Sequence, residues 1–337
     1  DKMYRCRYTF WDEKNFPGFK QALSDLYDRS INNYYKEKHD PRNQKRDLEC
    51  LNKIFPLIEY YYVSLIKLGY VDKKNYFNVL NQLKGIECIS ILKSTSISGV
   101  TVGKKISINP IPISLRDLNS EESFKLTVFH ELGHTITECW NKDVELVTTK
   151  LFNNSYIKNK LRKYGINSRN DLVNGFVLLE DVLVQEVAED VLYRSKDAVR
   201  PGFYYYDSDT FPGIKYRSNY SLYTIFQELG LKFFRSFKFI DCFGEKTISS
   251  ALNKCAIKGF YSNFIKNLDE EMSSDMNKMS DFALMLGCLG KVKNANYAEF
   301  GLGVSENYSR NTYYYNLFQT LVNDRMIRVV DEKKNNY

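Results

Sequence analysis

Two of the three histidines in this 337-residue chain lie four positions apart, in the segment His130-Glu-Leu-Gly-His134. Residues four apart on an α-helix share a face, so both imidazoles would project to the same side and could bind one ion. Glu131 follows the first histidine and would reach a metal-bound water without ligating the metal. The segment therefore predicts a metal-binding helix with His130 and His134 as ligands.

The residues around this segment also favour a helix. Asn119 or Ser120 could cap its start, and Glu121 and Glu122 would lie in its positively polarised first turn. Apolar residues recur with helical spacing at Phe124, Val128, Leu132 and Ile136. A glycine inside a helix costs about 1 kcal/mol, so Gly133 indicates close packing or function.

Neutral imidazoles suit Zn²⁺, which keeps one position open for water when three protein groups bind it. Such an ion lowers the pKa of the water, and Glu131 is expected to take its proton as general base. No histidine follows His134, and His39 lies in a charged segment, Lys36–Gln44, where a solvated side chain is expected. The third ligand is therefore expected to be a carboxylate. Glu138, Asp143 and Glu145 follow the motif closely and are weaker candidates.

A second long helix, expected from about Asn170 to Ser195, offers better carboxylates. At about 100° per residue, Glu180 lies at the centre of an apolar face. A carboxylate in a buried stripe is costly unless it is paired or binds a metal, so Glu180 is the first candidate for the third ligand. The other acidic residues lie elsewhere on this helix: Glu186 and Glu189 on the opposite, polar side, and Asp181 and Asp190 at the two borders.

The remaining sequence indicates a mostly helical α+β chain. Residues 1–84 form an expected N-terminal helical region, 85–200 a catalytic core and 201–337 a helical C-terminal subdomain. Three short segments rich in Ile and Val predict a small antiparallel sheet ahead of the motif helix: Ile86–Leu92, Gly99–Val102 and Lys105–Asn109.

Composition narrows the possible partners and compartments. The formal net charge is +7, but the basic residues form no single block, so nucleic acid is not the expected partner. The longest apolar stretch, Phe282–Leu289, is far shorter than the about 18 residues that span a membrane. Seven cysteines without a Cys-x-x-Cys pair indicate free thiols and a cytoplasmic protein. Secretion after removal of a signal peptide ahead of Asp1 is the alternative, and the oligomeric state is not indicated.

These residues resemble the gluzincins, thermolysin-like and anthrax lethal-factor-like zinc peptidases with His-Glu-x-x-His on one helix and a Glu ligand on a later one. The resemblance covers about Gly85 to Arg194. It implies a two-lobed zincin fold with two zinc-bearing helices, and an edge strand, here Lys105–Asn109, that binds extended substrate. The implied activity is hydrolysis of peptide bonds in a peptide or protein substrate. A catalytically inactive zincin-like protein, acting as a binding or regulatory module, is the alternative.

The resemblance leaves the third ligand open among Glu180, Glu186 and Asp181. Many gluzincins place the ligand in a segment like Asn-Glu-Gly/Ala-x-Thr, and laying it over Glu180–Gln185 puts Asp181 in the ligand position. Their Glu-x-x-x-Asp pattern instead matches Glu186 to Asp190, with Asp190 as the partner of a histidine. The tyrosines at 204–206 and 313–315 are candidates by residue type for stabilising an oxyanion.

Overall fold

The computed structural model describes residues 4–68, 70–71, 73–94, 97–111, 120–136, 140–194, 230, 232–233, 269–270, 272–294 and 313–325. The chain divides into two compact units. Unit 1 comprises Asp1–Glu138, Val184–Val199 and Leu252–Phe260, and unit 2 comprises Cys139–Leu183, Arg200–Ala251 and Tyr261–Tyr337. The division falls inside one continuous helix, α7 (Arg169–Arg194). The three-part division at residues 84 and 200 stays a prediction.

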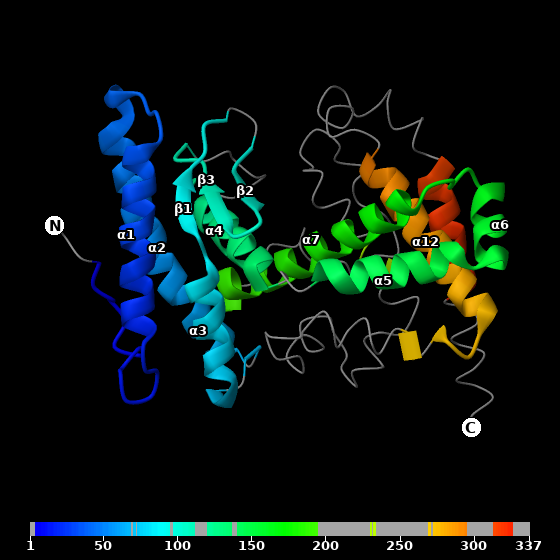
Figure 1. Ribbon diagram of the computed structural model, residues 1–337, viewed down its shortest axis with the longest axis horizontal. Helices are drawn as coiled ribbons and strands as arrows, with labels where there is room; N and C mark the ends of the chain where they lie inside the picture. Colours follow the sequence, from blue (N-terminus) through cyan, green and yellow to red (C-terminus); the bar gives the residue numbers. More distant parts are fainter. Residues whose placement is uncertain are drawn as a thin grey trace. The chain divides into compact units, whose positions relative to one another are not determined.

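Helices dominate the described residues, and a small sheet accompanies them (Figure 1), which confirms the mostly helical α+β class. Residues 313–325 are also helical. The other labelled helices are α1 (Phe19–Lys36), η1 (Pro41–Asn43), α2 (Gln44–Lys67), η2 (Lys73–Asn75), α3 (Tyr76–Gly85), α4 (Ser120–Ile136), α5 (Trp140–Asn153), α6 (Ser155–Lys163) and α12 (Met276–Asn294). Among the residues described, no helix has both the length and the apolar character needed to cross a membrane.

The sheet belongs to unit 1 and contains β1 (Cys88–Ile91), β2 (Gly99–Val102) and β3 (Lys105–Ile108) in the order β1-β3-β2. β3 pairs antiparallel with β2 across a two-residue turn, and parallel with β1. The prediction of an antiparallel meander was therefore wrong for β1. After β1 the chain forms β2 at the other edge of the sheet, and it then returns as β3, which lies between the two and runs parallel to β1. The predicted edge strand, Lys105–Asn109, is the central strand, and β2 lies at an edge.

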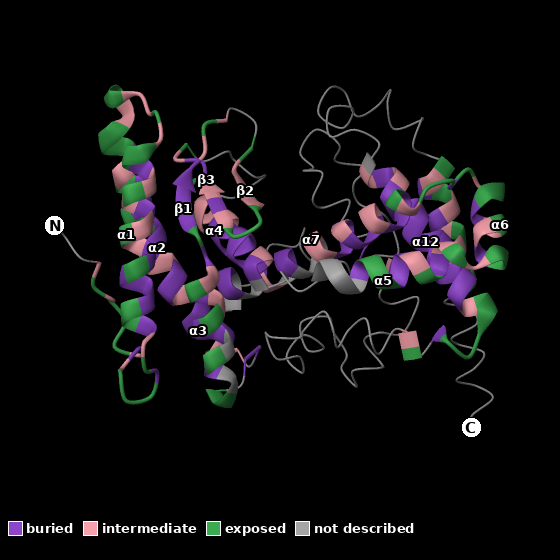
Figure 2. Cartoon of the chain, viewed as in Figure 1, coloured by how far each residue is buried: buried purple, intermediate pink, exposed green. Residues whose placement is uncertain are grey.

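Helices cover the sheet through their apolar faces (Figure 2). The buried residues of α1 recur with helical spacing, as in Phe19, Leu23 and Leu26, and this face packs along β1. α4 packs across β2 and β3, while α2 contacts both α4 and β1. Helix α4, which carries the predicted metal-binding motif, thus lies against the sheet edge formed by β2.

A buried carboxylate attaches the N-terminal segment to α2. Glu59 is 0% exposed, and its carboxylate accepts hydrogen bonds from the Tyr4 hydroxyl and from the backbone N–H groups of Arg7 (2.8 Å) and Tyr8 (3.1 Å). Because a buried charge needs such partners, this contact fixes the chain ahead of α1.

His39 is not the solvated loop residue that the charged segment around it predicted. Its side chain is only 7% exposed, and its ring stacks on Tyr34 with centroids 4.0 Å apart. Nε2 lies 3.4 Å from Glu37 Oε2. Stacking on an aromatic ring removes the imidazole from water even though its neighbours in sequence are charged.

In unit 2, α12 is buried on nearly every side. Its apolar core, which includes the predicted stretch Phe282–Leu289, packs against α5 and α6. Two glycines permit backbone contact with α7: a Cβ on Gly290 would overlap the carbonyl oxygen of Asp171, and one on Gly175 would overlap that of Leu286. Small residues at these positions set the distance between the two helices.

Candidate metal centre

The motif lies on a helix, as the sequence predicts, in the second half of α4. Gly133 is buried against α7: a Cβ at this position would lie 2.9 Å from Val184 Cβ and 3.6 Å from the Tyr61 hydroxyl. The expectation of close packing at Gly133 is therefore confirmed. The glycine lets the end of α4 approach α7 closely enough for side chains of the two helices to meet around His130.

The two motif histidines converge on one point. His130 Nε2 and His134 Nε2 are 3.1 Å apart, and the ring planes make an angle of 77°. Two nitrogen ligands at about 2.05 Å from a tetrahedral Zn²⁺ would lie about 3.3 Å apart. Two imidazole lone pairs at this distance repel each other unless a proton or a cation lies between them. The spacing therefore fits a shared cation.

A buried hydrogen-bond chain orients His130. Its Nδ1 lies 2.8 Å from Gln185 Oε1, and Gln185 Nε2 donates to Glu189 Oε1 at 3.0 Å. Because the Glu189 carboxylate accepts, the amide N–H₂ of Gln185 faces it, and the amide oxygen faces His130. His130 then carries its proton on Nδ1, which leaves Nε2 free to bind a metal.

The hydrogen bonds from His130 through Gln185 to Glu189 correct the sequence-based assignment of the faces of α7. Glu189 was placed on a polar side of the helix but is 0% exposed, and Gln185 was not singled out. α7 is buried around most of its circumference in the described positions, so periodicity does not identify one core face. A signal was nevertheless present, because Asp181, Gln185 and Glu189 are spaced four apart and form one polar stripe.

Asp181 completes a group of possible metal ligands. One donor atom each from His130, His134 and Asp181 lies within 4.8 Å of the others. This His-His-Asp group could hold a metal ion. Asp181 is half-buried and lies one helical turn before Gln185, on the same stripe of α7.

The structure does not bring the first candidate, Glu180, into this group. Glu180 is half-buried and precedes Asp181 on α7. Burial lowers the pKa of Lys293 on α12, while the negative charges of Asp181 and Glu180 act in the opposite direction. Both carboxylates therefore lie within the field of a cation. The side chains of Glu186 and Asp190 lie outside the described part of the chain.

Glu131 is held by the edge strand of the sheet. Its side chain is 5% exposed, and Oε2 accepts a hydrogen bond of 2.5 Å from the Thr101 hydroxyl on β2. Gly99 on the same strand makes room for it, since a Cβ there would lie 2.9 Å from Glu131 Cγ. The sequence predicted Glu131 as the general base but gave no sign of Thr101, because their contact spans thirty residues of chain.

The other candidate ligands and oxyanion-stabilising residues are not brought to this group in the described structure. Glu145 is exposed on α5, while Glu138 and the side chain of Asp143 lie outside the described residues, as do Tyr204–Tyr206. The Tyr314 hydroxyl donates to the carbonyl oxygen of Tyr164, which gives it a packing role within unit 2.

The described cysteines are free thiols: Cys6, Cys50, Cys88 and Cys288.

Comparison of the chain with protein-family models, curated proteins and solved structures finds no match. The residues of the metal centre are therefore the indication of function that this chain offers.

Proposed function

We propose that this chain is a zinc-dependent metallopeptidase. The observation that carries the proposal is the 3.1 Å distance between His130 Nε2 and His134 Nε2, with Asp181 in reach and Glu131 buried beside them. Two imidazoles and one carboxylate leave a fourth tetrahedral position for water, as in catalytic zinc sites. The active-site resemblance to gluzincins supports peptide-bond hydrolysis as the reaction.

Asp181 is our proposed third ligand, because its carboxylate belongs to the donor group that contains both histidines. Two histidines and one carboxylate also bind iron(II) in oxygenases. The glutamate directly after the first histidine favours zinc, since a hydrolytic site needs a general base beside the metal-bound water.

The roles of the protein groups follow from their positions. A bound zinc ion would lower the pKa of water and polarise the scissile carbonyl. The Glu131 carboxylate accepts the proton of the attacking water and then passes it to the leaving amine. Thr101 holds that carboxylate in place through its hydroxyl, and Gln185 holds the His130 ring. The substrate is a peptide or protein.

Metal analysis of the purified chain tests the centre directly. Elemental analysis should find close to one zinc per chain, and the His130→Ala, His134→Ala double variant should retain none. Iron at that ratio in place of zinc would overturn the zinc assignment. Retention of zinc by the double variant would exclude this group as its site.

Hydrolysis of an unstructured protein substrate tests the reaction. Glu131→Gln keeps the shape of the side chain but removes the base, so activity should fall by at least about 100-fold while zinc is retained. A wild-type chain that binds zinc and hydrolyses no peptide would contradict the peptidase proposal. That result would favour the alternative, an inactive zinc-binding module.

The free thiols also support a proposed location in the cytoplasm, where disulfides rarely persist. Thiol-blocking reagents added at cell lysis under denaturing conditions, which expose the buried thiols, should label every cysteine of the chain. A disulfide in the isolated chain would contradict this location.

A further inference from the structure

Unit 1 contains a pocket that the proposed peptidase does not use. Its volume is about 520 Å³, within the range of small-molecule sites. Leu92, Lys93 and Ser94 line it directly after β1, and Asn109 to Ile111 directly after β3. Ligands of α/β proteins commonly bind at the carboxyl ends of parallel strands, and β1 and β3 are the parallel pair.

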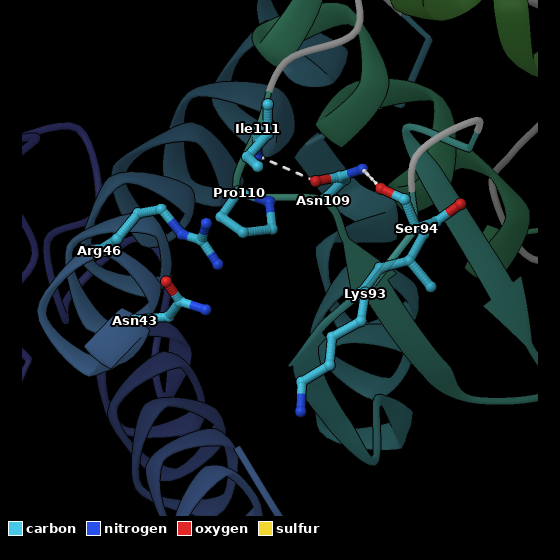
Figure 3. Close-up of a pocket in the computed structure, with 8 residues that line it drawn as sticks. Asn43, Arg46, Lys93, Ser94, Asn109, Pro110 and Ile111 are labelled. Carbon is cyan, nitrogen blue, oxygen red and sulfur yellow. Dashed lines mark hydrogen bonds between the residues drawn. The ribbon is translucent and has the colours of Figure 1, made fainter. Parts of the chain in front are cut away.

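The start of α2 forms the opposite wall. Figure 3 shows Asn43 and Arg46 on this side of the pocket, and Lys93 and Ser94 on the strand side. Asn43 is the N-cap of the 24-residue helix and makes no capping hydrogen bond with its side chain.

Asn109 makes the strand wall rigid. It is 3% exposed, and its amide N–H₂ donates to the carbonyl oxygens of Ser94 (2.7 Å) and Ile97 (3.0 Å). Its amide oxygen accepts from the backbone N–H of Ile111 at 2.9 Å. One buried side chain thus joins the segments that follow β1 and β3, so the pocket is formed before any ligand arrives.

The charges around the pocket favour an anion. Among the described residues that line the pocket, Arg46 and Lys93 are the charged ones, and both are cations. Arg46 Nε and Nη2 donate to the buried Asp47 carboxylate, which fixes the guanidinium; Lys93 Nζ donates to the Lys38 carbonyl oxygen at 2.6 Å. A hydrogen bond from Arg42 lowers the pKa of the nearby Asp40 carboxyl, and the positive charges of Lys93 and Arg46 lower it further.

We propose that this pocket binds the phosphate group of a small phosphate monoester, between Arg46 and Lys93. A phosphate monoester carries nearly two negative charges near pH 7 and has several acceptor oxygens. It can therefore bind two cations on opposite walls at once, whereas a ligand with a single carboxylate has one charge and two oxygens. The volume exceeds that of a phosphate group alone, so the remaining space accommodates the group esterified to it. This binding is independent of the proposed peptidase activity.

Calorimetric titration of the full chain with inorganic phosphate and with ribose 5-phosphate, at constant ionic strength, tests the proposal. Both should bind saturably, the ester more tightly, and acetate should bind at least about tenfold more weakly. Raising the pH from 5 to 7 should strengthen the binding of ribose 5-phosphate, because the second pKa of a phosphate monoester is about 6. Equal affinity for acetate would overturn the phosphate assignment.

Substitutions locate the binding. Lys93→Met should weaken binding at least about fivefold, since it removes one of two cations while keeping the aliphatic stem. Arg46→Gln should do the same; it also removes one hydrogen-bond partner of buried Asp47, which keeps the hydroxyl of Tyr34. Lys45→Met is the matched control, because it removes an exposed positive charge next to Arg46 outside the pocket lining and should leave the affinity unchanged. No saturable binding by wild type, or unchanged affinity in Lys93→Met, would contradict the proposal.

Discussion

The hydroxyl of Thr101 donates a 2.5 Å hydrogen bond to Glu131 Oε2, so a residue of the edge strand β2 orients the proposed general base. The same hydroxyl lies 3.2 Å from the Glu131 carbonyl oxygen. Thr101 therefore joins strand β2 to helix α4 at Glu131, the residue that would accept the proton of the attacking water.

Replacing Thr101 by Val should lower the rate of peptide hydrolysis by about tenfold, because the carboxylate loses the donor that fixes its position. Zinc content should not change, since Thr101 is not in the donor group. Steady-state kinetics would show the loss in kcat, and Thr101→Ser should restore most of it. Full activity in the Val variant would show that this contact has no role in positioning Glu131.

Gln185 should control metal affinity through the orientation of the His130 ring. Gln185→Met keeps the length of the side chain but removes both hydrogen bonds, so the dissociation constant for zinc should rise by about 10- to 100-fold. Competition with a zinc chelator measures this change. Gln21→Met makes the same chemical change at an exposed position and should have no effect. Equal affinities in all three proteins would contradict the proposed role.

The third ligand can be identified with two neighbouring substitutions. Asp181→Ala should lose bound zinc, whereas Glu180→Ala should retain it, because only Asp181 shares a donor group with the histidines. Elemental analysis after dialysis distinguishes them. The reverse result would restore Glu180, the residue favoured by the sequence, and retention of zinc by both variants would exclude both carboxylates.

Gly290 should be intolerant of any side chain. Gly290→Ala would force its Cβ against the carbonyl oxygen of Asp171, so we expect a loss of about 3 kcal/mol or more in the free energy of unfolding. The matched control is Gly85→Ala at the end of α3, where an added Cβ has no atom within 4 Å. This substitution should raise the free energy of unfolding by up to about 1 kcal/mol, because alanine favours the helix more than glycine does. Urea denaturation measures both; a tolerated Gly290→Ala would show that α7 and α12 are farther apart.

The ion pair between Glu37 and Lys105 should make stability depend on pH. Burial is the largest single influence on Glu37 and by itself raises its pKa. The 2.7 Å hydrogen bond from Lys105, a hydrogen bond from Asn33 and the positive charge of Lys105 together outweigh burial, so the net pKa lies below its ordinary value. A lowered carboxyl pKa contributes stability above the unfolded-state pKa, and this contribution is lost as pH falls through the folded-state value.

Lys105→Met should therefore lower the free energy of unfolding by about 0.5 kcal/mol at pH 7 and by less at about pH 3. The effect is small because both groups are one-third exposed and water screens their interaction. Urea denaturation at the two pH values checks this. Lys84→Met, at an exposed position, controls for the change in net charge. A cost that is the same at both pH values would show that the ion pair is not its source.

The sequence predicted the parts of the site that depend on local geometry. Histidines four apart converge on any α-helix, so α4 and the meeting of His130 with His134 followed from spacing alone. Non-local contacts could not be predicted. The partner of Glu131 lies on β2, and the partner of His130 lies on α7, and no local pattern specifies which strand or helix face meets α4.

Burial was the less reliable guide. Choosing Glu180 assumed that α7 has one apolar face, but the helix is enclosed on several sides, so hydrophobic residues mark contacts in several directions. The sheet shows the same limit. Strand segments were located correctly, yet their order was not, because the parallel pairing of β1 with β3 leaves no signal in either strand alone.

The order β1-β3-β2 has a consequence for how this part of the chain acquires its structure. β2 and β3 are joined by Gly103 and Lys104, with Gly103 at φ +62°, so their hairpin closes over only a few residues. β1 can pair only after β3 is in place, and short-range contacts form faster than long-range ones. We therefore expect the hairpin of β2 and β3 to form early and β1 to pair with it afterwards. Strand β2, whose Thr101 contacts Glu131 in the folded chain, would then form before α4 packs against the sheet.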